Sequence, residues 1–270
     1  VIPSYRTNND AILESILRLE SSKHAYVKFW LVVDNPDEGH LQQVKSLATK
    51  INQERFDVHG NYFVTVLHYG ENRGASYARN LGFNYSTADW TLFLDDDVRP
   101  SNHLLDAYLG AILRYPNAKV FVGNTELPPA FNVWTKMLRT CNIMFFYGIS
   151  KHVPFPPWGV TANIMVCGSR HNGNVQFKNI YPRTGGGEDI DFCFQIKDWY
   201  GSDSGGGGGG DNSSIHTNHR IIVAVPGATA YHPWWNNDGA STCYGQINGW
   251  AWGDSLCISE WPEKCYWSFP

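Results

Sequence analysis

Two patterns of hydrophobic and polar positions alternate along the first half of the chain. Short continuous apolar runs, such as Phe29–Val33, are typical of strands buried on both faces. Stretches with apolar residues three and four positions apart, such as the one around Ile12 and Ile16, predict helices. Strands are predicted at residues 1–5, 29–33, 62–67, 90–94 and 119–122, and helices at residues 8–22, 41–51, 75–83 and 101–113. This alternation predicts an α/β fold, with a mostly parallel central sheet flanked by helices.

The second half of the chain is less regular. A proline-rich stretch at 153–159 predicts a stiff loop, and residues 161–166 and 221–225 predict strands. Three glycines at 185–187 lead into a predicted helix that continues to Ile196. The run of glycines at 205–210 predicts a flexible loop over residues 201–214, either a natural insertion or an added linker. We interpret it as a tolerated surface loop, with a lid over a site as the alternative.

Composition and charge exclude several classes of protein. The chain has 270 residues and a net charge of −4, so no overall positive field favours nucleic acid or anionic membranes. It contains no run of 18 apolar residues, so we expect no transmembrane segment. No signal peptide is visible, although the opening Val1-Ile2-Pro3 resembles the middle of a strand. We therefore expect the natural protein to begin before Val1.

The six cysteines form no Cys-x-x-Cys pair, which argues against a zinc or redox site. Their even number permits disulfides, and free buried thiols fit equally well. Two sequons begin at Asn84 and Asn212. Together these features favour the lumen of the secretory pathway, such as the Golgi, with a cytoplasmic or membrane-associated location as the alternative.

Three adjacent carboxylates, Asp95–Asp97, directly follow the apolar run of the fourth predicted strand. Two like charges about 4 Å apart repel each other by roughly 4 kcal/mol at an effective dielectric constant of 20. A divalent cation of the Mg²⁺ type offsets this repulsion and keeps coordination positions open for phosphate. Asp34 follows another strand, and α/β sheets bind ligands beyond the carboxyl ends of their strands. The cluster therefore predicts a metal site, with a solvated acidic turn as the alternative.

Two other stretches carry candidate chemistry. The glycines at 185–187 permit close approach of backbone to a ligand, and Glu188 and Asp189 then open a helix. A carboxylate held there suits a general base, although acidic residues also decorate ordinary helix starts. His232 is either a metal ligand or a packed histidine. Arg79 and Asn80 are candidates for contacts with phosphate or a nucleotide.

Seven short motifs occur in a characteristic order between residue 1 and about residue 235. They are Val-Ile-Pro-Ser-Tyr at 1–5, Asp34, Asn72-x-Gly74-x-x-x-Ala78-Arg79-Asn80-x-Gly82, Asp95-x-Asp97, Gly159-x-x-Ala162-Asn163-Ile164-Met165, Gly187-Glu188-Asp189 and His232. In this order they resemble the family-2 glycosyltransferases of the GT-A fold. The Asp-Asp-Asp triplet and Tyr231-His232-Pro233-Trp234-Trp235 are similar to the galactofuranosyltransferase-like branch.

The resemblance implies a single GT-A domain over residues 1–270, Rossmann-like in architecture. Residues 1–125 would form its nucleotide-sugar-binding half, and residues 126–270 its acceptor and catalytic half. The residues implied to bind the donor are Pro3, Tyr5, Asp34, Arg79, Asn80, Asp95, Asp96 and Asn163. Asp34 would contact the base or ribose of a nucleotide, expected to be uridine, and Asp96 would lie near the donor sugar.

The resemblance also implies the remaining roles. Asp95, Asp97 and His232 would hold Mn²⁺ or Mg²⁺, and Asp189 would be the general base of an inverting transfer to a hydroxyl of a glycan or other acceptor. Glu188 would bind donor or acceptor hydroxyls. Trp158, Trp234 and Trp235 would offer flat apolar faces to acceptor sugars, with core packing as the alternative. Two departures from the family pattern are the short first strand and the glycine tract before His232.

Two other classes of protein compete with this interpretation. A phosphohydrolase of the haloacid-dehalogenase type also places Asp-x-Asp after an apolar strand, but it requires Thr or Val two residues beyond the second aspartate. Here that position is Arg99. A carbohydrate-binding module would not need both the aspartate cluster and the Gly-Glu-Asp segment. A catalytically inactive carbohydrate-binding relative stays open as well.

Overall fold

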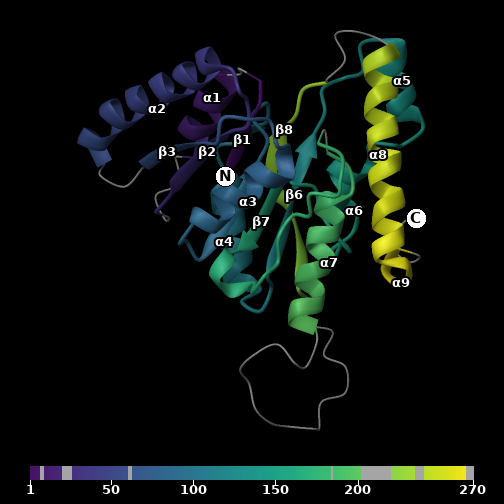
Figure 1. Ribbon diagram of the computed structural model, residues 1–270. Helices are drawn as coiled ribbons and strands as arrows, with labels where there is room; N and C mark the ends of the chain where they lie inside the picture. The colour runs from purple at the N-terminus through teal and green to yellow at the C-terminus, as the bar shows by residue number, and fades with distance from the viewer. Residues whose placement is uncertain are drawn as a thin grey trace, which may run out of the picture.

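The computed structural model describes residues 1–6, 9–19, 26–59, 63–183, 185–201, 220–234 and 240–265. Within these residues the strands form a central layer that is flanked by helices (Figure 1). The predicted α/β fold is confirmed. Trp235 and most of the predicted loop at 201–214 lie outside the described residues.

The N-terminal part of the central layer is a parallel sheet with the strand order β1-β2-β3. The interior strand, β2, buries Leu31, Val32 and Val33 completely, which explains its uninterrupted apolar sequence. The strands of this sheet and the helices around them are β1 Ile2–Ser4, β2 Lys28–Val33, β3 Phe63–His68, α1 Asn9–Leu19, α2 Glu38–His59 and α3 Ala75–Tyr85.

The second part of the layer is a mixed sheet with the order β4-β7-β6-β8-β5. β6 and β8 run parallel, whereas β4 and β6 each pair with β7 in the antiparallel sense, and β5 pairs with β8 likewise. The bounds of these strands are β4 Trp90–Leu94, β5 Arg99–Pro100, β6 Val120–Glu126, β7 Asn163–Cys167 and β8 Ile222–Tyr231.

Val1 joins the two sheets. Its backbone nitrogen donates to the Leu92 carbonyl oxygen at 2.8 Å, and its own carbonyl oxygen accepts from the Leu94 amide at 3.2 Å. These two bonds set β1 beside β4 in the parallel sense. The carboxyl ends of β1, β2 and β4 therefore meet at one edge of the combined sheet, where the segments that follow each strand come together.

Several elements of the second half were not expected from the sequence. They are α5 Val133–Thr140, α6 Ile149–His152, α8 Ala240–Glu260 and α9 Pro262–Cys265, beside the expected α4 Leu104–Arg114 and α7 Glu188–Gly201. Short 3₁₀ turns occupy Phe145–Gly148 and Ser169–His171. The long helix α8 packs against α7 (Figure 1). Its glycines at 245, 249 and 253 are poor helix formers, which hid the helix in the sequence.

All six cysteines are free thiols in the structure. Cys257 and Cys265 approach each other most closely in the C-terminal helices, with their sulfur atoms 3.8 Å apart. None of the helices in the described part of the chain combines the length and the apolar character that a membrane span requires.

Candidate active site

A cavity of about 800 Å³ lies beyond the carboxyl ends of β1, β2 and β4. Its lining combines residues that follow these strands with the glycine loop before α7 and one face of α8. The predicted site residues that line it are Pro3, Tyr5, Asp34, Arg79, Asp95, Asp96, Asp97, Trp158, Glu188, Asp189 and His232. Predicted residues as far apart in the sequence as Pro3 and His232 thus share one cavity.

The three carboxylates after β4 are crowded and half-buried. Burial, followed by the negative charges of Asp97 and Asp95, raises the pKa of Asp96 to about 7. Burial also raises the pKa of Asp97, although His232 opposes that change. Asp96 accepts a hydrogen bond from the Tyr5 amide at 3.3 Å, which ties the cluster to the end of β1. The cluster carries negative charge that a bound cation would neutralise.

His232 presents one nitrogen to this cluster. Its Nδ1 lies 2.6 Å from the Pro233 carbonyl oxygen, and because a carbonyl can only accept, Nδ1 must carry the proton. In the neutral ring Nε2 then holds the lone pair, and it lies 3.5 Å from Asp97 Oδ1. Metal-binding histidines commonly donate their second ring N–H to a backbone carbonyl in this way.

Asp95, Asp97 and His232 therefore fit a metal site. One ligand atom from each lies within 4.8 Å of the others. The set of two carboxylates and one imidazole suits Mn²⁺ or Mg²⁺ and leaves further coordination positions for phosphate oxygens.

Arg79 connects the metal cluster to the start of α7. Its guanidinium is almost fully buried, and it donates to Asp95 Oδ1 at 2.9 Å and to Glu188 Oε1 at 3.0 Å. A buried guanidinium needs such anionic partners, because burying a lone charge is costly. The neighbouring charges of Asp95 and Glu188 keep the pKa of Arg79 raised despite burial. Arg79 thereby fixes the distance between the two acidic parts of the site.

Asp34 organises the wall formed by the segment after β3. Its two carboxylate oxygens accept from the amides of Arg73 at 2.7 Å and Gly74 at 2.9 Å, and the Tyr69 hydroxyl donates to it as well. Asp34 also lines the cavity. The carboxylate therefore shapes the wall in addition to the predicted contact with a nucleotide, which stays a prediction.

The glycine loop brings Glu188 and Asp189 to the cavity. Gly185, Gly186 and Gly187 have φ values of 90°, 131° and 85°, a region that side-chain-bearing residues rarely adopt. Glu188 is buried, and its Oε2 accepts from the Gly186 amide at 2.5 Å. Burial, then the charge of Glu188, raises the pKa of Asp189 to about 8, while Arg79 opposes the increase. A carboxylate with a pKa near neutrality is well suited to general-base chemistry.

Two asparagines differ from their predicted role in donor binding. Asn80 forms two hydrogen bonds of 2.8 Å with the backbone of Phe177. Its Nδ2 donates to the carbonyl oxygen and its Oδ1 accepts from the amide. Asn80 does not line the cavity. Asn163 is buried between strands, where it donates to the carbonyl oxygens of Asn124 and Ala228. The side-chain amides of both residues are hydrogen-bonded to backbone groups of the protein, so we no longer assign either residue to the donor site.

Trp234 also differs from its predicted contact with an acceptor. Its ring is buried, its Nε1 donates to the Pro128 carbonyl oxygen at 3.0 Å, and it does not line the cavity. Core packing, the alternative stated above, describes it correctly. Trp158 does line the cavity, whereas Trp235 lies outside the described residues.

Sequence reasoning missed the contribution of α8. Gln246, Trp250 and Asp254 of this helix line the cavity. The helix approaches the glycine loop so closely that a Cβ atom on Gly253 would lie 1.9 Å from the Gly186 carbonyl oxygen. The spacing of glycines at 245, 249 and 253 was the available signal for a close helix contact.

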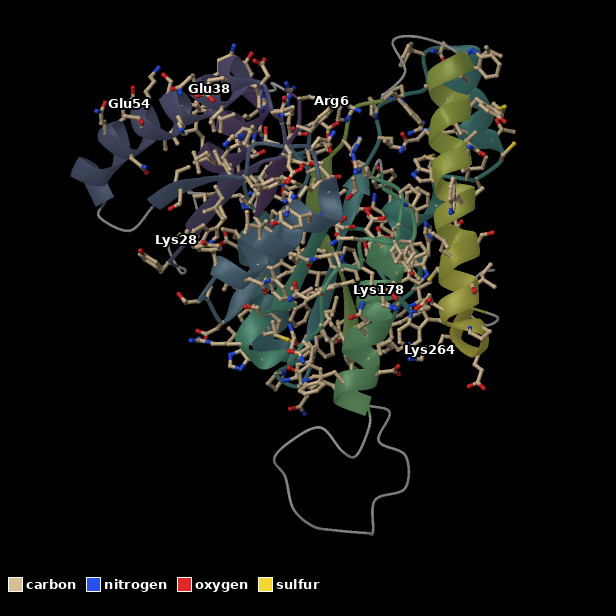
Figure 2. All side chains as sticks on the ribbon, viewed as in Figure 1. Arg6, Lys28, Glu38, Glu54, Lys178 and Lys264 are labelled. Carbon is tan, nitrogen blue, oxygen red and sulfur yellow. The ribbon has the colours of Figure 1, made fainter. Side chains whose placement is uncertain are left out.

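Two arginines were also missed. Arg6 lies beyond the end of β1, at the upper edge of the molecule in Figure 2, and lines the cavity. Arg183, just before the glycine loop, lines it as well. Both are exposed cations beside an acidic site, which suits contact with an anionic ligand.

Known proteins resemble this chain in sequence and in fold. The family model described as glycosyl transferase family 2 matches residues 1–183. An uncharacterized glycosyltransferase of Haemophilus influenzae is 33% identical over 101 residues, which cover 36% of this chain and 28% of the relative.

Two solved structures share the fold at low sequence identity. A mannosyltransferase from Pyrobaculum calidifontis in complex with GDP-Man and Mn²⁺ has a TM-score of 0.62 at 12% identity, over 96% of this chain and 63% of that chain. GalNAc-T7 with UDP, GalNAc and Mn²⁺ has a TM-score of 0.59 at 12% identity, over 97% and 50% of the two chains. The family match extends over more than half of the chain, and these neighbours share its architecture. The protein is therefore a glycosyltransferase of family 2 with the GT-A fold.

Proposed function

We propose that this protein is an inverting, metal-dependent enzyme that transfers a sugar from a nucleotide-diphospho-sugar to an acceptor hydroxyl. The observation that carries the proposal is the shared cavity, in which the cluster of Asp95, Asp97 and His232 faces the same space as Asp189. UDP-sugars are the first donors to test. The Mn²⁺ complexes with GDP-Man and with UDP among the structural neighbours support a donor of this class.

The residues at the strand ends would hold the donor. Asp95, Asp97 and His232 would bind the cation. Bound there, Mn²⁺ or Mg²⁺ supplies Lewis-acid stabilisation of the leaving diphosphate. Pro3, Tyr5 and Asp34 line the part of the cavity at β1 and β2, where the nucleoside would lie. Arg6 and Arg183 line the cavity, where their positive charges would neutralise part of the negative charge of the diphosphate.

Asp189 would act on the acceptor. As the acceptor oxygen forms its bond to the anomeric carbon, Asp189 takes up the hydroxyl proton and the bond from that carbon to the diphosphate breaks. A single displacement of this kind inverts the anomeric configuration, as in single-step glycosidases. Glu188 is held by Arg79 and the Gly186 amide, so it would orient this loop and contribute a polar edge to the sugar site. Positioning of the two substrates supplies much of the rate.

Release of nucleoside diphosphate from a panel of UDP-sugars and GDP-sugars tests the proposed function. We expect release from at least one donor with Mn²⁺ or Mg²⁺, and loss of release when EDTA removes the metal. NMR of the product should show inversion at the anomeric carbon. A protein that binds sugar nucleotides but releases nothing under any of these conditions would be an inactive relative.

We expect Gly253→Ala to lower turnover by roughly 10²-fold, the usual effect of a misplacement of about 1 Å near catalytic groups. A Cβ atom there would lie 1.9 Å from the Gly186 carbonyl oxygen and would push α8 away from the loop before Asp189. The matched control is Gly245→Ala, two turns earlier on α8, where a Cβ meets nothing within 4 Å. Alanine favours helix by about 1 kcal/mol, so the control should be slightly more stable and fully active. Equal activity of both variants would show that the contact does not position the loop.

A further inference from the structure

One face of α8 presents three side chains to the cavity at intervals of four residues. Gln246, Trp250 and Asp254 all line it, and four-residue spacing places side chains above one another on a helix. The aromatic ring thus lies between an amide and a carboxylate. The family match ends at residue 183, so this face belongs to the part of the chain that the family model does not describe.

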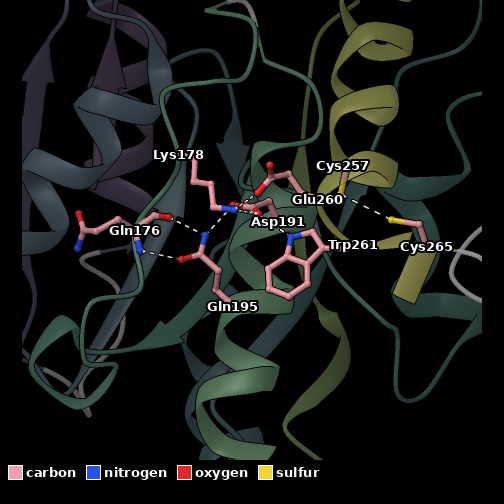
Figure 3. Close-up of polar contacts among 8 residues, drawn as sticks. All are labelled: Gln176, Lys178, Asp191, Gln195, Cys257, Glu260, Trp261 and Cys265. Atoms are coloured by element: carbon pink, nitrogen blue, oxygen red, sulfur yellow. Dashed lines mark hydrogen bonds and ion pairs between the residues drawn. The ribbon is translucent and has the colours of Figure 1, made fainter. Parts of the chain in front are cut away.

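α8 is held firmly against α7 near this face. Figure 3 shows Asp191 of α7 at the centre of the polar contacts, where it accepts from Trp261 Nε1 at 2.6 Å and pairs with Lys178 at 3.1 Å. Lys178 also pairs with Glu260, the last residue of α8, at 2.7 Å. Together with the contact between Gly186 and Gly253, these bonds determine which face of α8 meets the cavity.

Aromatic side chains continue the surface around Trp250. Its ring packs edge-on against Phe146 at a centroid distance of 5.6 Å, and Phe146 in turn lies beside Trp158. Both Phe146 and Trp158 line the cavity. The buried Nε1 of Trp158 has no hydrogen-bond partner among the described residues. A buried N–H without an acceptor is costly, and a ligand oxygen can satisfy it.

The polar side chains on either side of Trp250 can form hydrogen bonds with a ligand. Neither the Gln246 side chain nor the Asp254 side chain forms a hydrogen bond or ion pair with another group in the described part of the chain. Both side chains are half-buried, and burial raises the pKa of Asp254. A partly buried carboxylate gains most from hydroxyl donors, since these replace the water it has lost.

We propose that the Gln246, Trp250 and Asp254 face of α8 is the acceptor-binding surface and that the acceptor is a saccharide. The inference rests on the proposed transferase function. A pyranose ring has an apolar C–H face that can lie against Trp250, and equatorial hydroxyls at its rim that reach Gln246 and Asp254. A long-chain lipid alcohol would match the aromatic surface but would leave the carboxylate of Asp254 without hydroxyl partners.

A glycan array tests the proposal directly. The parent protein, loaded with Mn²⁺ and UDP, is compared with Trp250→Ala and Trp252→Ala. Trp252 is the matched control, because it lies two residues along the same helix, is 64% exposed and does not line the cavity. We expect Trp250→Ala to weaken glycan binding by about 10- to 100-fold, as for a buried aromatic anchor, and Trp252→Ala to bind as the parent does.

Two further variants separate a binding role from a structural one. Trp250→Phe keeps an aromatic face and should recover part of the affinity. Asp254→Asn keeps the side-chain volume and should raise the acceptor KM more than it lowers kcat. If Trp250→Ala fails to fold, Asp254→Asn still tests whether this face of α8 binds the acceptor.

Equal glycan binding by the Trp250 and Trp252 variants would overturn the proposal, as would turnover with a lipid alcohol but with no saccharide. Nucleotide release from UDP-sugars and GDP-sugars is measured in parallel, in the presence of each glycan that binds. If release is absent with every bound glycan but glycan binding still depends on Trp250, the catalytic proposal fails while the saccharide site stands.

Discussion

Asp189→Asn is expected to lower kcat by ~10²–10⁴-fold, the usual contribution of a general base. The amide keeps the size of the side chain but cannot accept the proton of the acceptor hydroxyl. Because Asp97 and His232 are unchanged, Mn²⁺-dependent binding of the nucleotide should stay as in the parent. Turnover is measured by release of nucleoside diphosphate under saturating donor and acceptor, and nucleotide affinity by calorimetry.

The role of Asp189 as a base also predicts the direction in which kcat/KM changes with pH. The base works in its ionised form, and burial raises the pKa of Asp189 to about 8 in the free protein. We therefore expect kcat/KM to rise with pH as this carboxyl loses its proton, and we expect the rise to be absent from the Asn variant. A variant that retains near-parental turnover or the same rise would remove Asp189 from this role.

The melting temperature of Asp189→Asn shows whether a loss of turnover is caused by unfolding. The folded pKa of Asp189 is above its ordinary value of 3.8, so the folded state holds this proton more strongly than the unfolded chain. Its contribution to stability is complete below pH 4 and is lost as pH rises toward about 8. Asparagine cannot ionise, so above pH 8 the variant should melt at a higher temperature than the parent. Loss of turnover with a raised Tm cannot be attributed to unfolding.

Asp97→Asn is expected to abolish most of the metal-dependent binding of the nucleotide and to lower turnover by ~10²–10³-fold. The metal contributes several kcal/mol of charge stabilisation, and each 1.36 kcal/mol corresponds to a factor of ten. An amide oxygen is a weaker ligand than a carboxylate and does not offset the charge of the cation. Calorimetry of nucleoside diphosphate, with Mn²⁺ and with EDTA, measures the change.

The control for this variant is Asp89→Asn. Asp89 precedes β4, its side chain is 79% exposed, and it does not line the cavity. It should bind nucleotide in a metal-dependent manner, as the parent does. In EDTA the parent and Asp97→Asn should have the same weak affinity. Unchanged affinity of Asp97→Asn in Mn²⁺ would contradict the ligand set of Asp95, Asp97 and His232.

The sequence alone determined the α/β class and the end of the sheet at which ligands bind. A buried strand such as β2 requires continuous apolar residues, and parallel strands bring their carboxyl ends to one edge. Asp34 and Asp95–Asp97 follow such runs directly, so their shared location could be predicted from local pattern. The order of short motifs added the family, because many weak signals in one order are specific together.

Tertiary structure decided which polar residues face the cavity and which serve the core. An asparagine suits either role, and Asn80 and Asn163 were assigned to the core only by the backbone groups that surround them. Trp234 is a similar case, because an indole packs equally well in a core or against a ligand. Local sequence does not encode these distant partners.

The contribution of α8 also depended on tertiary structure. Its glycines reduce helix propensity, yet they permit the close packing on Gly186 and Gly187 that stabilises the helix in this place. Trp250 and Asp254 reach the cavity through that packing, more than 150 positions after the aspartates that follow β4. Strand ends and buried runs arise from local hydrophobic pattern, whereas the meeting of α8 with the active-site loop arises from contacts between backbones that are far apart in the chain.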